Sequence, residues 1–341
     1  MKAVVVHGKD DLRVDDVAEP ICGPDDVLVA IEWGGICGSD ISYWKNGASG
    51  TAVLSEPLVL GHEVAGHVAK VGENVVGVEE GARVTIHPAT YVGDHEMPAD
   101  MAERTNLWPE VRYFGSAAFK PHEQGGFSAY RVVRPDQLRY LPDSVSTKDG
   151  ALAEPFGVAI HAVKRAGDVS GRTVLVNGAG PIGVLTVAAA KAAGAKKVYA
   201  SDLSAAALAI AAKMGADETI NVAEGQTLPS DVDFSFEASG APAALGNVVA
   251  ATRRGGTVVQ VGNLPGGQVQ AVLGNIVTRE INYRGSYRFI DEITDAVELM
   301  ANGVDMSPLQ THEFGIDDAA QAFATAADRS TGSSKVMLKL S

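Results

Sequence analysis

Four side chains of the kinds that bind zinc occur in short motifs of this sequence, namely Cys37, His62, Glu63 and Glu154. A thiolate, an imidazole and a carboxylate together form a typical catalytic zinc site and leave one coordination position for water or substrate. The glycines beside Cys37 and His62 allow the close backbone approach that a small metal ion requires. Each residue also has an ordinary structural interpretation, because an isolated cysteine is commonly a buried small apolar side chain. Their spacing alone does not choose between the two.

A second motif is typical of dinucleotide binding. Gly178, Gly180 and Gly183 fit the pattern G-x-G-x-x-G between an apolar run at 173–176 and an alanine-rich segment. Such glycines permit the turn, the approach of a pyrophosphate and close helix–sheet packing. Asp202 would end the next strand, where a carboxylate binds a ribose 2′-hydroxyl and repels a 2′-phosphate. We therefore expect the cofactor to be NAD rather than NADP. The alternative to a dinucleotide site is a tight turn between a strand and a helix, with Asp202 exposed.

Composition excludes several classes of protein. The 341 residues contain 28 lysines and arginines against 42 aspartates and glutamates, so the net charge of -14 argues against a nucleic-acid partner. The chain has only two cysteines, Cys22 and Cys37, which excludes a disulfide framework. We find neither an apolar run long enough to span a membrane nor a signal-peptide pattern, and expect no membrane partner and a cytoplasmic protein.

Two regions of different pattern must position these motifs. Up to about residue 145, Pro and Gly separate short apolar runs, which predicts an antiparallel barrel-like domain with strands at 27–31, 58–60, 64–71, 83–87 and 128–133. From about residue 152, strands alternate with helices, which predicts a parallel sheet covered on both faces. The expected strands there are 173–176, 198–200, 232–236 and 257–261, and the expected helices 181–193 and 205–214. Helices at 293–300 and 319–327 and a strand at 336–340 complete the chain.

Several stretches resemble one known family over essentially the whole chain. Segments 35–40, 61–63, 153–155 and 178–183 occur in the same order as in the zinc-dependent medium-chain dehydrogenases. Glu154, where ethanol-active members have cysteine, resembles the polyol branch typified by sorbitol dehydrogenase. Within that branch, three further segments are similar to the L-idonate 5-dehydrogenases: 112–117, 121–127 and 284–289.

The resemblance implies an α/β protein with two domains. A β-rich, barrel-like (GroES-like) catalytic domain would span 1–148 and be completed by 289–341. A Rossmann dinucleotide-binding domain, a doubly wound parallel sheet, would span 149–288. Relatives in the polyol branch are usually tetramers, so the resemblance also implies a homo-oligomer, with a tetramer favoured.

Roles for the site residues follow from the same resemblance. Cys37 and His62, with Glu63, Glu154 or both, would hold one catalytic zinc. Asp40 would contact His62 and fix its tautomer, and Ser39, Glu63 and Glu154 would be the catalytic groups. Substrate would meet Tyr43, Phe114, Glu154, Arg288 and Phe289. The cofactor would meet Gly178, Gly180, Pro181, Ile182, Gly183, Asp202, Leu203, Val261, Gly262, Asn263, Ser286 and Tyr287.

Three departures from the family pattern carry expectations of their own. No cysteine occurs between His87 and Gly115, where the family usually binds a structural zinc, so we expect a single zinc and interpret the acidic residues of this lobe as solvated. Ser42 replaces a relay histidine, so the proton would leave through water or the ribose hydroxyls. Ala207 replaces an arginine beside the adenosine, so cofactor binding would be weaker or depend more on Asp202.

The expected activity is oxidation of a secondary hydroxyl in a sugar acid or polyol. Zinc would lower the hydroxyl pKa, Ser39 would take the proton, and hydride would pass to the nicotinamide. The resemblance favours L-idonate as substrate and 5-keto-D-gluconate as product, with Arg288 pairing with the carboxylate and Arg112 and Lys120 as further candidates. The alternatives are a dehydrogenase of neutral polyols such as sorbitol or xylitol, a zinc-free reductase of the same superfamily, and a non-catalytic nucleotide-binding module.

Overall fold

The computed structural model describes residues 1–341, and the chain folds as two units. The first unit comprises Met1–Glu154, Met300–Gly303 and Gln310–Ser341. The second comprises Pro155–Leu299 and Val304–Leu309. The expected domain boundaries were 148/149 and 288/289, so the first unit runs slightly further and residues 289–299 belong with the second. Which unit is catalytic and which binds a dinucleotide stays a prediction at this point.

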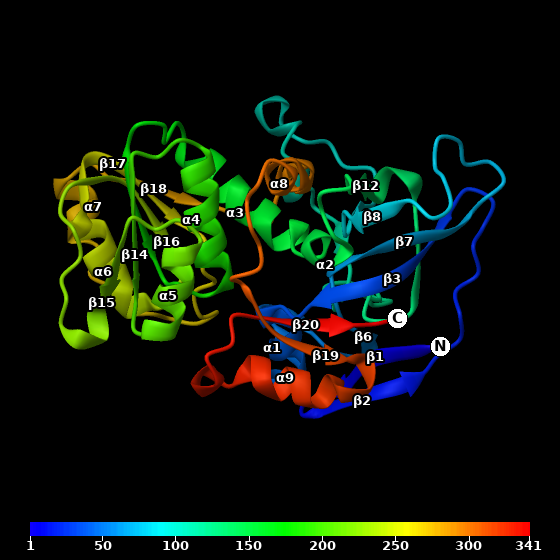
Figure 1. The fold of residues 1–341 in the computed structure, drawn as a ribbon. Coiled ribbons are helices and arrows are strands. Elements are labelled where there is room, and N and C mark those ends of the chain that lie inside the picture. The colour runs from blue at the N-terminus through cyan, green and yellow to red at the C-terminus, as the bar shows by residue number, and fades with distance from the viewer. The chain divides into compact units, whose positions relative to one another are not determined.

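The first unit is built on a seven-stranded sheet (Figure 1). Its strands run in the order β12-β8-β7-β3-β20-β19, and β11 pairs with β3. All neighbours are antiparallel except β19 and β20. Their bounds are β3 (Val27–Gly35), β7 (Glu63–Val71), β8 (Arg83–Ile86), β11 (Tyr130–Val133), β12 (Leu138–Tyr140), β19 (Gln310–Gly315) and β20 (Lys335–Lys339).

Smaller elements complete this unit. A three-stranded sheet contains β1 (Lys2–Gly8), β2 (Asp11–Asp16) and β6 (Leu58–Val59), and two hairpin-like pairs contain β4 (Ala48–Ser49), β5 (Ala52–Val53), β9 (Ala89–Tyr91) and β10 (Val111–Tyr113). The helices are α1 (Gly38–Asn46), α2 (Thr147–Gly150) and α9 (Ala319–Ala327). The core is mainly aliphatic, and within it the rings of Phe127 and Phe323 pack edge to face with their centroids 6.4 Å apart.

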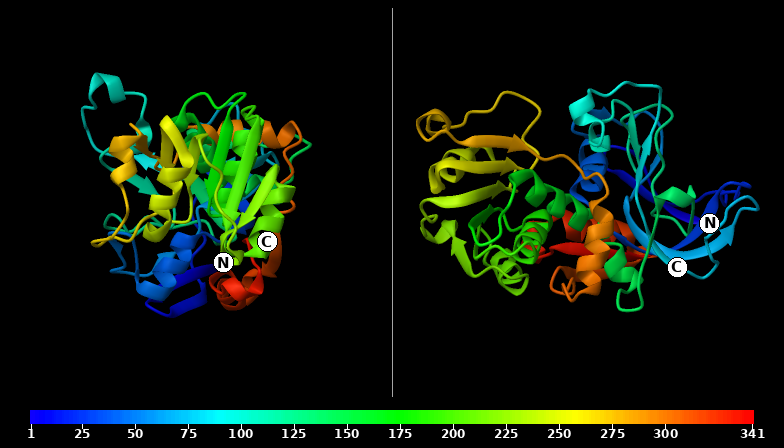
Figure 2. Two further views of the ribbon diagram at one scale, coloured as in Figure 1. Left: turned by 90° about the vertical axis from the view of Figure 1, so that its left-hand side faces the viewer. Right: turned by 90° about the horizontal axis from the view of Figure 1, so that it is seen from above.

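The second unit is a six-stranded parallel sheet with helices on its two faces (Figure 2). The strand order is β15-β14-β13-β16-β17-β18. The strands are β13 (Thr173–Asn177), β14 (Lys197–Asp202), β15 (Glu218–Asn221), β16 (Val232–Glu237), β17 (Thr252–Gln260) and β18 (Asn282–Gly285). The helices are α4 (Pro181–Ala192), α5 (Ala205–Lys213), α6 (Pro242–Ala251), α7 (Gly274–Thr278) and α8 (Glu292–Ala301), while α3 (Ala153–Ala166) contains the sequence boundary between the units. The prediction of a doubly wound α/β fold with a second, β-rich unit is confirmed.

None of the helices is both long and apolar enough to cross a membrane.

A buried carboxylate ties α3 to α8 in the second unit. Glu292 Oε1 lies 3.1 Å from His161 Nδ1 and 3.5 Å from Lys164 Nζ, and Oε2 accepts the Ile290 N–H at 2.7 Å. Burial opposes ionisation of Glu292, but the hydrogen bonds from His161 and Ile290 and the nearby positive charges outweigh it. Together they lower the pKa of Glu292 to about 2.

This pKa shift makes the stability of the chain depend on pH. Because the folded state holds the Glu292 proton less tightly than the unfolded state, the stabilisation is complete above roughly pH 5 and is lost as the pH falls toward 2. We expect Glu292→Gln to lower the free energy of unfolding at pH 7 by roughly 2 to 3 kcal/mol. The loss should be less than half as large at pH 3, measured by urea denaturation.

The matched control is Glu298→Gln, which removes an exposed carboxylate from the same helix and should change stability little at either pH. An equal loss for Glu292→Gln at both pH values would contradict the charge-based explanation.

Candidate active site

Strand register brings three of the predicted metal ligands together. β3 and β7 pair Gly35 with Glu63. Cys37 is the second residue after β3, and His62 directly precedes β7. One ligand atom from each of Cys37, His62 and Glu63 lies within 4.8 Å of the others. His62 and Glu63 are buried, and Cys37 is partly exposed. One sulfur, one nitrogen and one carboxylate oxygen at this separation fit a zinc site that remains open on one side.

Two glycines give these ligands the room that they need. A Cβ at Gly35 would lie 2.3 Å from Glu63 Oε2, and so would displace the carboxylate. Gly61 has a φ of +95°, and a Cβ there would lie 2.2 Å from the ring of Phe127. The glycines beside the ligands are therefore steric requirements of the cluster.

A buried lysine from the C-terminal strand holds Glu63. Lys335 Nζ donates to both carboxylate oxygens of Glu63 at 2.7 Å and to the Ile36 carbonyl at 3.3 Å. Burial lowers the pKa of Lys335, but the charges of Glu63, Cys37 and Glu154 and the hydrogen bonds to Glu63 together outweigh burial and raise the pKa, so the lysine stays protonated. Because each carboxylate oxygen has two lone pairs, the ion pair leaves acceptor capacity on Glu63 for a metal ion.

Glu154 stands apart from this trio in its hydrogen bonding. Its Oε1 accepts the hydroxyl of Tyr113 at 2.5 Å, and both residues are buried. Burial raises the pKa of Glu154, although the charge of His62 opposes the shift. The sequence left open which glutamate binds metal, and the geometry places Glu63 in the cluster and Glu154 on Tyr113.

Asp40 organises the backbone of both ligand-bearing segments. Its Oδ2 accepts the Cys37 N–H at 2.9 Å and its Oδ1 accepts the Gly61 N–H at 3.2 Å. Oδ1 lies 3.9 Å from His62 Nδ1, which is longer than a hydrogen bond. The predicted contact with the imidazole is thus electrostatic, and the hydrogen bonds go to the neighbouring main chain.

Negative charge dominates the cluster. Burial lowers the pKa of His62, but the negative charges of Cys37 and Asp40 outweigh that effect and raise it well above the ordinary value. Four side chains here can carry a negative charge, namely Cys37, Asp40, Glu63 and Glu154. Lys335 carries a positive charge. A divalent cation would relieve this imbalance, and it would compete with the proton on His62.

The other predicted residues of the first unit have defined partners. Tyr43 is buried, and its hydroxyl accepts the Ala117 N–H at 3.0 Å. Phe114 is buried under the guanidinium of Arg131, which lies 4.4 Å from the ring centroid. Ser39 lies partly exposed in the first turn of α1. Arg112 donates to the Pro121 carbonyl at 3.0 Å and therefore stabilises its own loop.

The lobe between His87 and Gly115 has a small apolar cluster of its own. Ala89, Val111 and Tyr113 are buried in it, and Trp108 packs against them. The Trp108 indole N–H donates to the Val92 carbonyl at 2.7 Å. This packing gives the lobe an internal source of order.

The glycine-rich loop of the second unit has the expected geometry. Gly178 has a φ of +94°, and a Cβ on Gly183 would lie 1.7 Å from the Gly178 carbonyl oxygen. A Cβ on Gly180, which caps α4, would meet nothing within 4 Å, so that side of the loop is open. Asp202 accepts the Ala179 N–H at 2.6 Å and the Ser204 N–H at 2.9 Å. It therefore shapes the loop as well as the strand end.

Most of the remaining predicted cofactor and substrate residues of this unit follow β17 or β18, and Leu203 follows β14. Ser286 Oγ is buried without a hydrogen-bond partner, an orphaned polar atom that a bound dinucleotide could satisfy. Arg288 adopts a φ of +50°, with its guanidinium 4.9 Å from the Tyr287 ring centroid, and Phe289 is buried. Leu203 is exposed. With the open glycine loop, these features fit a dinucleotide.

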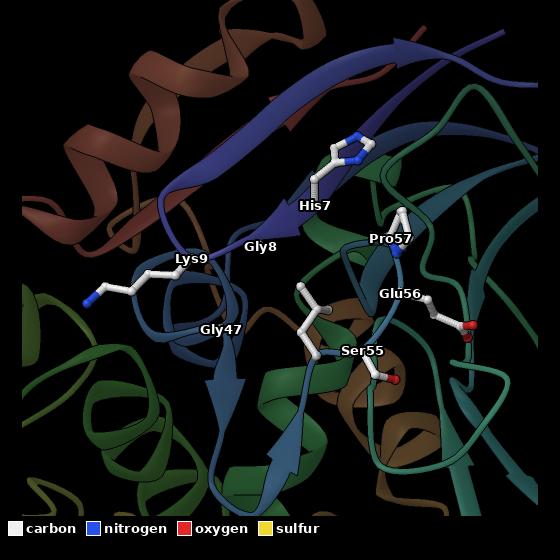
Figure 3. A pocket seen from close by; sticks show the side chains of 8 residues that line it. His7, Gly8, Lys9, Gly47, Ser55, Glu56 and Pro57 are labelled. Carbon is white, nitrogen blue, oxygen red and sulfur yellow. The ribbon is translucent and has the colours of Figure 1, made fainter.

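A pocket of about 300 Å³ opens elsewhere in the first unit (Figure 3). It lies between the end of β1 and the segment after β5, and it is lined by His7, Gly8, Lys9, Gly47, Leu54, Ser55, Glu56 and Pro57. None of the predicted site residues lines it, so it is separate from the metal-ligand cluster.

The sequence did not indicate three residues that form buried hydrogen bonds. These are Lys335 with Glu63, Tyr113 with Glu154, and Glu237 with Asn177 and Gln260. A lysine at the start of a strongly apolar final strand was the available signal for Lys335. For Tyr113 and Glu237 no spacing pattern pointed to their partners.

Comparisons with known proteins agree with this geometry. Residues 23–143 match the alcohol dehydrogenase GroES-like domain, and residues 181–302 match the zinc-binding dehydrogenase domain. The chain is 37% identical to sorbitol dehydrogenase of Rattus norvegicus over 340 residues, covering 95% of this chain and 92% of the relative. It is also 37% identical to L-idonate 5-dehydrogenase (NAD(P)(+)) of Escherichia coli, covering 91% of each. The crystal structure of an E. coli L-idonate 5-dehydrogenase is similar with a TM-score of 0.92 and 35% identity, covering 99% of this chain and 97% of that one.

The Lys335–Glu63 pair allows a direct test of the cluster without metal. Lys335→Met leaves a buried carboxylate unpaired, so we expect the free energy of unfolding in a chelator to fall by about 3–5 kcal/mol. Adding Glu63→Gln to that variant should restore much of the loss. Chemical denaturation measures both.

The control is Lys339→Met, which removes an exposed lysine from the same strand and should have little effect. A loss below about 1 kcal/mol for Lys335→Met would mean that the buried pair is not formed.

Proposed function

The chain belongs to the zinc-dependent medium-chain dehydrogenases, in the group of sorbitol dehydrogenase and L-idonate 5-dehydrogenase, and from this we propose that it is a zinc- and NAD-dependent oxidoreductase of a sugar acid or polyol. The observation that carries the proposal is the cluster of Cys37, His62 and Glu63 within 4.8 Å. A non-catalytic nucleotide-binding protein would have no use for this cluster.

We assign the metal ligands to Cys37, His62 and Glu63. Zinc held there would supply Lewis-acid activation of the substrate hydroxyl. Lys335 fixes the direction of the Glu63 carboxylate, and Asp40 fixes the two segments that carry Cys37 and His62. The ligands are thus positioned by the protein before metal binds, which reduces the reorganisation that binding requires.

The proton and the substrate are assigned to neighbouring side chains. Ser39 would accept the hydroxyl proton, and Glu154, held by Tyr113, would accept a hydrogen bond from the substrate. Tyr43 and Phe114 would contact its carbon chain. Ser42 donates to the Gly38 carbonyl and has no ionisable group, so the proton would leave through water or the ribose hydroxyls.

The dinucleotide, when bound, would accept the hydride. Gly180 and the start of α4 would receive the pyrophosphate, because the amides at a helix N-terminus favour an anion. Asp202 would bind the ribose 2′-hydroxyl with its remaining lone pairs and disfavour a 2′-phosphate, which supports NAD over NADP. The chain would carry a single zinc, since the lobe up to Gly115 is ordered by Trp108 and its apolar neighbours.

We propose L-idonate as substrate and 5-keto-D-gluconate as product. Arg288 is the proposed partner of the substrate carboxylate, as the family resemblance implies, because a guanidinium can bind a carboxylate through two parallel hydrogen bonds. A neutral polyol is the second candidate, and the equal identity to a sorbitol dehydrogenase favours it.

A homo-oligomer, with a tetramer favoured, is proposed on a separate observation. β18 is exposed along its length at the edge of the parallel sheet, and exposed apolar side chains lie near it in sequence: Val272, Leu273, Val277 and Tyr283. An exposed edge strand beside apolar side chains is commonly covered by a partner.

Metal content and turnover test the proposed function together. We expect about one zinc per chain, with NAD reduction on L-idonate exceeding that on xylitol and sorbitol. Glu63→Gln should lose zinc, whereas Glu154→Gln should keep zinc and lose kcat by about a hundredfold or more. Elemental analysis and steady-state kinetics measure these quantities.

Each other outcome has a distinct meaning. Zinc loss in Glu154→Gln but not in Glu63→Gln would reverse the ligand assignment. Turnover of neutral polyols alone would replace the sugar acid as substrate, and zinc-free protein without turnover would contradict the proposal.

Arg288 provides a test of the substrate class. Arg288→Ala should raise the KM for L-idonate by about tenfold or more and change the KM for xylitol by less than about twofold, because only the acid loses an ion pair. Equal changes in both KM values would remove Arg288 from carboxylate recognition.

A further inference from the structure

A buried carboxylate that the proposed mechanism does not use lies at the carboxyl end of β16. Glu237 is fully buried, and its partners are neutral donors. Oε1 accepts from Asn177 Nδ2 at 3.3 Å and from the N–H and hydroxyl of Ser239. Oε2 accepts the Gly240 N–H at 3.1 Å and Gln260 Nε2 at 2.6 Å. Five hydrogen bonds thus compensate for burying a charge without a cation.

Glu237 is the centre of a polar row that crosses the sheet. Strand register pairs Ser201 with Asn177, Asn177 with Glu237, and Glu237 with Gln260. The side chains are hydrogen-bonded in the same order, with Ser201 Oγ donating to Asn177 Oδ1 at 3.0 Å. The row therefore joins the carboxyl ends of β14, β13, β16 and β17, where open α/β sheets bind their ligands.

The row also fixes the two loops that follow β16 and β17. The N–H groups of Val261 and Gly262 donate to the Glu237 carbonyl, and Gln260 Nε2 donates to both Glu237 and the Gly262 carbonyl at 2.6 Å. A Cβ on Gly262 would lie 2.4 Å from Gly240 N, so the loops are in direct contact. The Glu237 carboxylate thus contacts the first loop directly and is connected to the second through Gln260.

We propose that Glu237 is a positioning residue for the dinucleotide, acting through Gln260 and the loop at 261–263. This inference rests on the proposed function and on the family resemblance, which implies that Val261, Gly262 and Asn263 contact the cofactor and that Asn263 lies at its nicotinamide half. The adenosine half is assigned to the glycine loop and Asp202. Asn177, which precedes that loop, also accepts a hydrogen bond from Ser201, which does not involve Glu237.

An amide cannot replace this carboxylate. Each oxygen of Glu237 faces only donors, so the side-chain NH₂ group introduced by Glu237→Gln would oppose donors whichever way the amide turned. The loops must then shift to separate these groups. The adenosine subsite depends on Gly178, Gly180 and Asp202 and should be affected less.

Two ligands separate positioning from general destabilisation. On the full-length zinc-loaded protein, titration calorimetry measures the Kd of NADH and of ADP-ribose, which lacks the nicotinamide. We expect Glu237→Gln to raise the Kd of NADH by about tenfold and that of ADP-ribose by less than about twofold. Gln260→Met keeps the carboxylate but removes the bridge to the loop, and should produce the same selectivity if Glu237→Gln does not fold.

Glu298→Gln, an exposed change of the same type in the same unit, should alter neither Kd. Unchanged NADH binding in Glu237→Gln and Gln260→Met, or equal weakening of both ligands with a lowered Tm, would overturn the positioning role. Failure of the unmodified protein to bind either ligand would instead overturn the proposed dinucleotide site, and this inference with it.

Discussion

The ion pair between Lys335 and Glu63 is the interaction on which the candidate metal centre depends. It joins the C-terminal strand β20 to the first residue of β7, across 272 residues of sequence. The pair forms because β20 and β7 flank β3, and because Gly35 on β3 leaves space for the Glu63 carboxylate. Burying two charges is costly unless their geometry is good. Here Lys335 donates to both carboxylate oxygens, which offsets the cost of burying the two charges. The ion pair thereby fixes the Glu63 carboxylate beside Cys37 and His62.

The second unit stabilises a buried carboxylate in a different way. Glu237 has neutral donors from β13, from β17 and from the loop after β16, whereas Glu63 has a lysine. The difference suits the two proposed ligands. A metal cluster contains several anions and needs a compensating cation, whereas Glu237 is a single carboxylate whose neutral donors also fix the adjoining loops.

Local patterns were sufficient to predict part of this arrangement. The glycine loop, Asp202 and the strands at 173–176 and 232–236 follow from periodicity and turn chemistry, and the structure has strands at these positions. Cys37, His62 and Glu63 could be proposed together because glycine-containing motifs and a family resemblance pointed to them. The fold class was predicted for the same reasons.

The rest depended on pairings between distant segments. β2, β15 and β19 are partly exposed strands with little periodicity, and β1 is a buried valine run without alternation, so none of the four could be predicted as a strand. Lys335 could not be connected to Glu63 without the strand order, since hydrophobic patterns do not specify which strands are neighbours. The choice between Glu63 and Glu154 depended on Tyr113, whose hydroxyl is brought to Glu154 only by the folded lobe.

Zinc K-edge X-ray absorption of the zinc-loaded protein shows whether Cys37, His62 and Glu63 hold one metal ion. The predicted spectrum contains a single sulfur neighbour at about 2.3 Å with nitrogen and oxygen neighbours at about 2.0–2.2 Å. A coordination shell of nitrogen and oxygen alone would place the metal away from Cys37 and contradict the account.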